Sequence, residues 1–188
     1  MKHKSGFVSI IGYPNAGKST LVNALVGEKL SIVNAKVQTT RDRILGIYNS
    51  ENYQIVFSDT PGIIDPKYKL QKKMMSYVMS SFLDSDLVVY VFDSNSNKSI
   101  VGKIKDILLE LKVPLLIVIN KIDLINQQKV EEIMESLKSD FLDSDVIPIS
   151  AKNEFNLEKV LDTIKSNLQE SPPFYDKTWF TDRSERYL

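Results

Sequence analysis

The chain has 188 residues, 43% of them hydrophobic, which is enough for one well-packed domain and a short tail. Its 24 basic and 24 acidic residues cancel, and this balance argues against broad electrostatic binding of nucleic acid. The sequence has no cysteine, which excludes disulfides and thiolate metal sites, and no run in it approaches the roughly twenty apolar residues of a membrane span.

Short apolar runs alternate with helical patterns along most of the chain. Residues 7–12 predict a buried strand, and residues 18–27 predict a helix that ends at a glycine. Residues 43–49 and 53–59 predict two strands that a polar turn joins. The other expected elements are helices over 71–83, 99–111, 127–140 and 157–168 and strands over 87–93, 114–120 and 146–150.

This alternation predicts a three-layer α/β domain with a mostly parallel six-stranded sheet. The continuous apolar runs over 87–93 and 114–120 agree, since parallel strands are covered on both faces. The short turn between the second and third strands adds one antiparallel edge strand. We expect the domain to span residues 1–170. Residues 171–188 should form a tail or the start of a linker, because their hydrophobic residues follow neither a helical nor a strand periodicity.

The stretch GYPNAGKST, residues 12–20, matches the phosphate-binding pattern G-x-x-x-x-G-K-[ST] between a predicted strand and a predicted helix. Its glycines let successive backbone N–H groups face a phosphate, and the helix adds its N-terminal dipole. Lys18 is expected to reach the β- and γ-phosphates, and Ser19 to ligate Mg²⁺. The domain is therefore expected to be a P-loop NTPase. The loop residues expected to bind nucleotide are Gly12, Asn15, Ala16, Gly17, Lys18, Ser19 and Thr20.

The sequence DTPG follows the third predicted strand. Asp59 is suited to hold Mg²⁺ through a water molecule, and the N–H of Gly62 can donate to a γ-phosphate. A proline–glycine turn after a strand is common by itself, but its order after the phosphate loop makes it informative. The next residue is Ile63, at a position where well-studied phosphate-cleaving switches carry a glutamine that orients the attacking water. An isoleucine side chain cannot hydrogen-bond to water.

The sequence NKID, at the end of a buried strand, indicates which base is bound. The Asp123 carboxylate can accept hydrogen bonds from N1–H and the 2-amino group of guanine, whereas adenine would leave it unpaired. The stem of Lys121 can lie over the base, and Asn120 can tie its loop to the phosphate loop. After the last strand comes SAK, where the N–H of Ala151 can meet guanine O6. The base-site residues expected from both motifs are Asn120, Lys121, Asp123, Ser150, Ala151 and Lys152.

These motifs resemble, in kind and order, those of the translation-factor-related GTPases, and within that class the chain closely resembles the Era family of bacterial ribosome-associated GTPases. The resemblance extends over essentially the whole chain and is carried by GYPNAGKSTLVNAL, QTTRDRILGI, DTPG, NKID, SAK and TDRSERY. It implies a fold of the small G-protein type and Mg²⁺-dependent hydrolysis of GTP to GDP and phosphate. Era proteins also carry a C-terminal KH domain that binds the 3′ end of 16S rRNA, and we expect this chain to lack it.

The resemblance also places a switch segment at VQTTRDR. Thr39 or Thr40 is expected to ligate Mg²⁺ and touch the γ-phosphate, and we favour Thr40. Three sources of positive charge for hydrolysis stay open: an arginine of this segment (Arg41 or Arg43), an arginine from a partner, or a K⁺ ion. We favour K⁺ bound by Asn15, because related GTPases that share PNxGKS use this asparagine in that way.

The expected function is a GTPase switch in assembly of the small ribosomal subunit, with slow turnover because Ile63 cannot orient water. The residues expected to act in hydrolysis are Asn15, Lys18, Thr40 and Gly62, with Mg²⁺ on Ser19, Thr40 and Asp59. The alternative is a guanine-nucleotide switch module with negligible turnover whose output is partner binding. In longer family members the resemblance implies 16S rRNA and the small ribosomal subunit as partners, mainly through the KH domain. It also implies a cytoplasmic location with peripheral association at the inner membrane.

Overall fold

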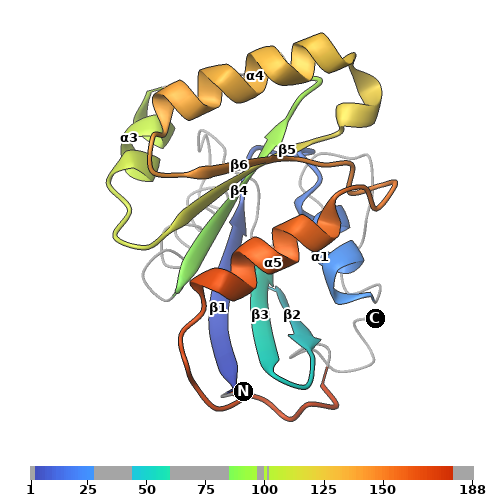
Figure 1. The fold of residues 1–188 in the computed structure, drawn as a ribbon, viewed down its shortest axis with the longest axis vertical. Coiled ribbons are helices and arrows are strands. Elements are labelled where there is room, and N and C mark those ends of the chain that lie inside the picture. The colour runs from blue at the N-terminus through green and yellow to red at the C-terminus, as the bar shows by residue number, and fades with distance from the viewer. Residues whose placement is uncertain (1–2, 28–43, 60–84, 97–99, 101, 180–188) are drawn as a thin grey trace, which may run out of the picture.

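The computed structural model describes residues 3–27, 44–59, 85–96, 100 and 102–179 (Figure 1). The strands are β1 (Lys4–Ile11), β2 (Ile44–Asn49), β3 (Tyr53–Asp59), β4 (Leu87–Asp93), β5 (Leu115–Asn120) and β6 (Asp145–Pro148). The described helices are α1 (Lys18–Val26), α3 (Lys103–Leu109), α4 (Gln127–Asp140), α5 (Leu157–Asn167) and the short 3₁₀ helix η1 (Ile122–Leu124). The strands form a six-stranded sheet in the order β2-β3-β1-β4-β5-β6.

The strand pairing confirms the predicted fold class. β1 pairs in parallel with β3 and β4, and β5 pairs in parallel with β4 and β6. β2 differs because a tight turn joins it to β3, so it runs antiparallel at the edge of the sheet. The carboxyl ends of the parallel strands therefore lie at one end of the sheet, where ligands of open α/β sheets bind.

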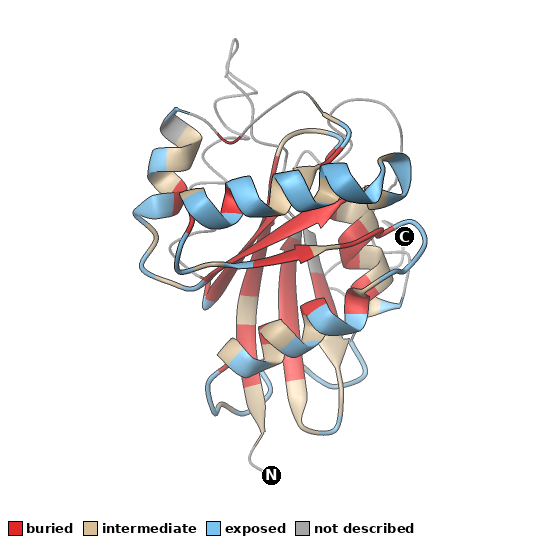
Figure 2. Ribbon diagram, turned by 45° about the horizontal axis from the view of Figure 1, so that its top comes forward, coloured by how far each residue is buried: buried red, intermediate tan, exposed pale blue. Residues whose placement is uncertain are grey.

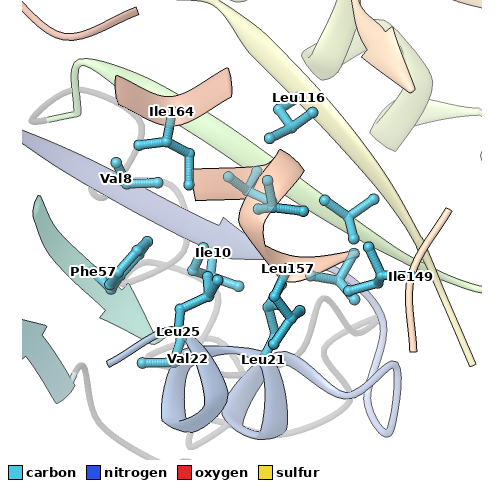
Figure 3. Packing of buried hydrophobic residues seen from close by; sticks show 14 of the residues in the cluster. Val8, Ile10, Leu21, Val22, Leu25, Phe57, Leu116, Ile149, Leu157 and Ile164 are labelled. Atoms are coloured by element: carbon cyan, nitrogen blue, oxygen red, sulfur yellow. The ribbon is translucent and has the colours of Figure 1, made fainter. Parts of the chain in front are cut away.

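Two hydrophobic cores lie on opposite faces of the sheet, which gives the predicted three layers. Successive strand residues point to opposite faces. On β4, Val89 packs toward α1 and α5, whereas Val88 packs toward α3 and α4. Figure 3 shows the first core, to which α1 contributes Leu21 and α5 contributes Ile164. Figure 2 shows that buried residues concentrate in the sheet, while much of α4 is exposed.

The ends of α1 and α4 follow the local sequence signals. α1 begins after Gly17 and ends before Gly27, whose φ of 81° is the left-handed conformation that closes many helices. α4 covers the predicted residues 127–140, and the side chain of Asn126 caps it by accepting a hydrogen bond from the N–H of Lys129 at 2.9 Å.

Other elements differ from the prediction in length or lie outside the described residues. β1 begins at Lys4 rather than residue 7, because this polar start still pairs with β3. α3 begins at Lys103, after Gly102 with φ of 59°, so it is shorter than predicted. The predicted helix over 71–83 lies outside the described residues. Within the described ranges, no helix combines the length and apolar character needed to cross a membrane.

The segment after α5 packs against the domain beside β1 and β3. Phe174 stacks on Phe7 of β1, with ring centroids 4.8 Å apart. The buried Gln54 amide accepts hydrogen bonds from the N–H groups of Phe174 and Tyr175 at 2.7 and 2.9 Å, and donates to the Tyr175 carbonyl at 2.9 Å. This stretch is therefore held by the domain, while the predicted boundary at residue 170 stays a prediction.

Tyr90 of β4 lies in the core on the face of the sheet that α3 and α4 cover, and substitutions at this residue test the packing of that core. Its side chain is fully buried, and its hydroxyl has no hydrogen-bond partner among the described residues. Burial, with a smaller contribution from Tyr13, raises the pKa of the Tyr90 phenol above its ordinary value, so the group stays neutral. Because an unpaired buried hydroxyl is destabilising, Tyr90→Phe should raise the free energy of unfolding by about 1 kcal/mol in urea denaturation.

The aromatic ring of Tyr90, unlike its hydroxyl, should stabilise the fold. Tyr90→Ala removes the packed ring as well as the hydroxyl, so it should lower the free energy of unfolding by about 3 kcal/mol. A comparable loss in Tyr90→Phe would show instead that the hydroxyl contributes a hydrogen bond.

Candidate functional site

The phosphate loop connects the end of β1 to the start of α1. Its two glycines adopt positive φ angles, 151° at Gly12 and 95° at Gly17. A side chain at Gly12 would collide with the backbone carbonyl oxygen of Val91, and one at Gly17 would collide with Nδ2 of Asn120. Both glycines therefore let neighbouring strands approach the loop closely, and both avoid strain that other residues would carry.

Lys18 gives the loop its positive charge. The residue is buried, and its Nζ donates to the carbonyl oxygens of Gly12 at 3.3 Å and Tyr13 at 3.1 Å. The first turn of α1 carries no acidic side chain, so nothing in that turn neutralises the partial positive charge at the helix start. The loop can therefore attract an anion through both an ammonium group and a helix N-terminus.

Asn120 connects three parts of the site. It ends β5 and is buried, and its Nδ2 donates to the Ala16 carbonyl of the phosphate loop at 2.9 Å. Its Oδ1 accepts a hydrogen bond from the N–H of Ala151 at 3.0 Å. The predicted tie to the phosphate loop is confirmed. The second contact was not predicted, and the contact of the Ala151 N–H with guanine O6 stays a prediction.

Asp123 and Ser150 meet at the same edge of the sheet. Asp123 lies in η1 and is exposed, and its Oδ1 accepts a hydrogen bond from the Ser150 hydroxyl at 2.5 Å. The Ser150 oxygen also accepts from the N–H of Asn153 at 3.3 Å. Backbone hydrogen bonds between Ser150 and Phe155, at 3.0 and 3.3 Å, close this loop. The arrangement fixes one oxygen of the carboxylate and leaves its other acceptor positions for a ligand.

Asp93 is a contact of the site that the motifs did not identify. It ends β4, and its Oδ2 accepts a hydrogen bond from Nζ of Lys121 at 2.7 Å. The signal that could have found it is the aspartate that closes the apolar run LVVYVFD. Because β4 and β5 are parallel neighbours, the end of one strand lies beside the motif that ends the other.

The other predicted site residues that the structure describes differ in exposure and position. Asn15 is exposed and has a left-handed φ of 64°, Thr20 is half-buried in α1, and Lys152 is exposed. Asp59 is the last residue of β3 and pairs with Ile10 of β1, which places its backbone beside the phosphate loop. The residues that lie outside the described ranges are Thr39, Thr40, Arg41, Arg43, Gly62 and Ile63.

Comparison with known sequences gives consistent matches. The sequence model of the family described as "50S ribosome-binding GTPase" matches residues 7–121. GTPase Era from Alkaliphilus metalliredigens is 40% identical over 193 residues, and GTPase Era from Lactobacillus helveticus is 43% identical over 189 residues. These alignments cover 100% and 98% of this chain, but only 64% and 62% of the two relatives.

Solved structures with the same fold include two of Era. The crystal structure of Era in complex with MgGDPNP and nucleotides 1506–1542 of 16S ribosomal RNA matches with a TM-score of 0.90 and 34% identity. That match covers 98% of this chain and 63% of the other. An Aquifex aeolicus Era variant bound to GDP and AlF4⁻ matches with a TM-score of 0.89 and 33% identity, over 97% of this chain and 63% of the other.

Proposed function

Because the chain belongs to the family described as 50S ribosome-binding GTPases, we propose that it binds GTP and GDP and hydrolyses GTP to GDP and inorganic phosphate. The observation that carries this proposal is the position of the Asn120 amide, which joins the phosphate loop at Ala16 to the second loop at Ala151. One buried side chain thereby holds the groups expected to grip the phosphates and those expected to read the base in a fixed arrangement.

Guanine selectivity would come from Asp123. The Ser150 hydroxyl donates to Oδ1 of this carboxylate, which orients it. The remaining lone pairs can accept from N1–H and the 2-amino group of guanine, whereas adenine has an acceptor at N1 and no 2-amino group. A site built to hydrogen-bond the donors of guanine strongly rejects adenine, which lacks them.

Magnesium is the metal that the residues of the site would suit. Ser19, in the first turn of α1, offers a hydroxyl, and Asp59, at the end of β3, offers a carboxylate that would act through a water molecule. With Thr40 as a further ligand, this set consists of oxygen donors, which Mg²⁺ prefers. When bound, the ion would neutralise charge on the phosphate oxygens, while Lys18 would bind the same phosphates directly.

Hydrolysis is expected to be slow because Ile63 cannot orient the attacking water, which would then be placed by backbone groups such as the N–H of Gly62. A loss of two to three powers of ten in rate corresponds to about 3–4 kcal/mol of barrier. The Asn15 amide is exposed in the phosphate loop, where it could bind K⁺ beside the phosphates. The ion would then supply positive charge that stabilises the transition state.

Turnover measured with different monovalent cations tests the role of Asn15. Phosphate release by the parent chain should be at least about tenfold faster in K⁺ than in Na⁺. Asn15→Gly removes the amide but tolerates the left-handed φ of 64°, so it should abolish this difference while GDP affinity changes little. Equal rates of the parent chain in the two salts would contradict the proposed K⁺ site.

The same measurement separates the enzyme from a binding module. Tight GDP binding with negligible phosphate release in either salt would favour a guanine-nucleotide switch whose output is partner binding. In that case an arginine supplied by a partner would be the remaining source of charge for hydrolysis.

We place this activity in assembly of the small ribosomal subunit. The support is the similarity to Era, whose structure with a 16S ribosomal RNA fragment is matched over 63% of its length. Contacts with RNA would be made mainly by a KH domain of the kind that Era proteins carry, since this chain has no net charge to attract RNA. The proposed location is the cytoplasm, with peripheral association at the inner membrane.

A further inference from the structure

We propose that Asp93 is a positioning residue for guanine-nucleotide binding and that it acts through Lys121. This inference rests on the guanine-nucleotide binding proposed above. Asp93 is the last residue of β4, and its partner in the parallel register is Asn120 of β5, the residue directly before Lys121. Its carboxylate therefore lies beside the segment that is expected to bind the base.

Both oxygens of the Asp93 carboxylate are engaged. Oδ2 accepts a hydrogen bond from Nζ of Lys121 at 2.7 Å, and Oδ1 accepts from the N–H of Asn95 at 3.0 Å. The two charged side chains are 16% and 29% exposed, for Asp93 and Lys121 respectively. Next to them, the N–H of Ser94 donates to the Asn120 carbonyl at 3.0 Å, which ties the ends of the two strands together. The carboxylate is thus a fixed anchor for the lysine.

The backbone fixes the other end of the Lys121 side chain. Lys121 has a left-handed φ of 66°, an uncommon conformation for a residue with a side chain, and it directly precedes η1. Its stem therefore runs from the start of η1 to the end of β4. A lysine stem held at both ends has less conformational freedom to lose when a base packs against it. Asp93 would strengthen nucleotide binding by holding that stem in place before the nucleotide arrives.

An ion pair of this length need not affect binding at all, because partly exposed pairs often contribute little. The chain offers a matched pair for comparison. Lys105 of α3 and Asp140 of α4 are also 2.7 Å apart, with side chains 31% and 38% exposed, and they belong to none of the nucleotide-binding motifs. Asp140→Asn therefore controls for the loss of a similar ion pair elsewhere in the domain.

The test is a double-mutant cycle on the dissociation constant of fluorescently labelled GDP. Asp93→Asn should weaken binding about tenfold, which corresponds to about 1.4 kcal/mol. In a Lys121→Met background, which keeps an apolar stem without the charge, Asp93→Asn should change binding less than about twofold, since its partner is gone. Asp93→Glu, which keeps the carboxylate, should recover part of the affinity, and Asp140→Asn should match the parent.

Two results would overturn the proposal. One is unchanged or tighter GDP binding in Asp93→Asn. The other is that Asp93→Asn weakens GDP binding equally in the parent and in the Lys121→Met background. That result would assign the effect to the folding of the end of β4 rather than to the lysine. Failure of the parent chain to bind GDP would instead contradict the proposed function, so the two failures are distinguishable.

Discussion

Replacing Asp123 with asparagine should lower GDP affinity about 10³-fold, or about 4 kcal/mol, and should make xanthosine diphosphate the preferred ligand. In the proposed complex the carboxylate would accept from two donors of guanine, whereas an amide offers one acceptor and one donor. Xanthine keeps N1–H but carries a carbonyl in place of the 2-amino group, so it matches the amide. The Ser150 hydroxyl donates to Oδ1 of Asp123 at 2.5 Å, and it can hold the asparagine oxygen at the same place.

Competition between GDP and xanthosine diphosphate for the parent and variant chains would measure this change of preferred ligand. Asp143→Asn is a suitable control, because it removes an exposed carboxylate outside the motifs, and it should leave both affinities within about twofold. If Asp123→Asn bound GDP as tightly as the parent, the carboxylate would not be the group that reads the base.

Asn120→Ala should both destabilise the chain and abolish most nucleotide binding. The substitution leaves the Ala16 carbonyl and the Ala151 N–H without the partner they have in this structure, at 2.9 and 3.0 Å. An unsatisfied buried group costs about 1–3 kcal/mol, so the free energy of unfolding should fall by about 2–4 kcal/mol. Because the two loops would no longer be held together, GDP affinity should fall by at least about a hundredfold.

Urea denaturation of the nucleotide-free chain and GDP titration of the folded variant measure these effects separately. Asn167→Ala provides the control, since its Nδ2 donates to the Thr163 carbonyl at the same 2.9 Å but within the partly exposed end of α5. It should cost less than about 1 kcal/mol and leave GDP binding unchanged. A loss in Asn120→Ala no larger than in this control would rule out the buried amide as the link between the loops.

The parallel sheet could be read from local patterns, and so could the loops that lie at the ends of its strands. The apolar runs of β4 and β5 predict buried parallel strands, and the residues that follow such strands meet at one edge of the sheet. The conformation of the phosphate loop was predictable, because its glycines and its lysine belong to one short motif with a defined backbone conformation. Even the link from Asn120 to the phosphate loop was expected, since both belong to motifs with defined positions.

Contacts between distant segments could not be predicted in this way. The partner of Lys121 lies 28 residues earlier in the chain, and only the register of β4 against β5 brings Asp93 to it. Gln54 accepts hydrogen bonds from the N–H groups of Phe174 and Tyr175, which lie about 120 residues later in a stretch without helical or strand periodicity. Such hydrogen bonds depend on tertiary packing, whereas sequence patterns report the local environment of each element.

Calorimetric titration of the nucleotide-free chain with GDP and with ADP, in the presence of Mg²⁺, tests guanine recognition by Asp123 most directly. We expect GDP to bind at least about 10³-fold more tightly than ADP, because adenine lacks the N1–H and 2-amino donors for the remaining lone pairs of the carboxylate. Comparable affinities of the two diphosphates for the folded chain would contradict the proposed function.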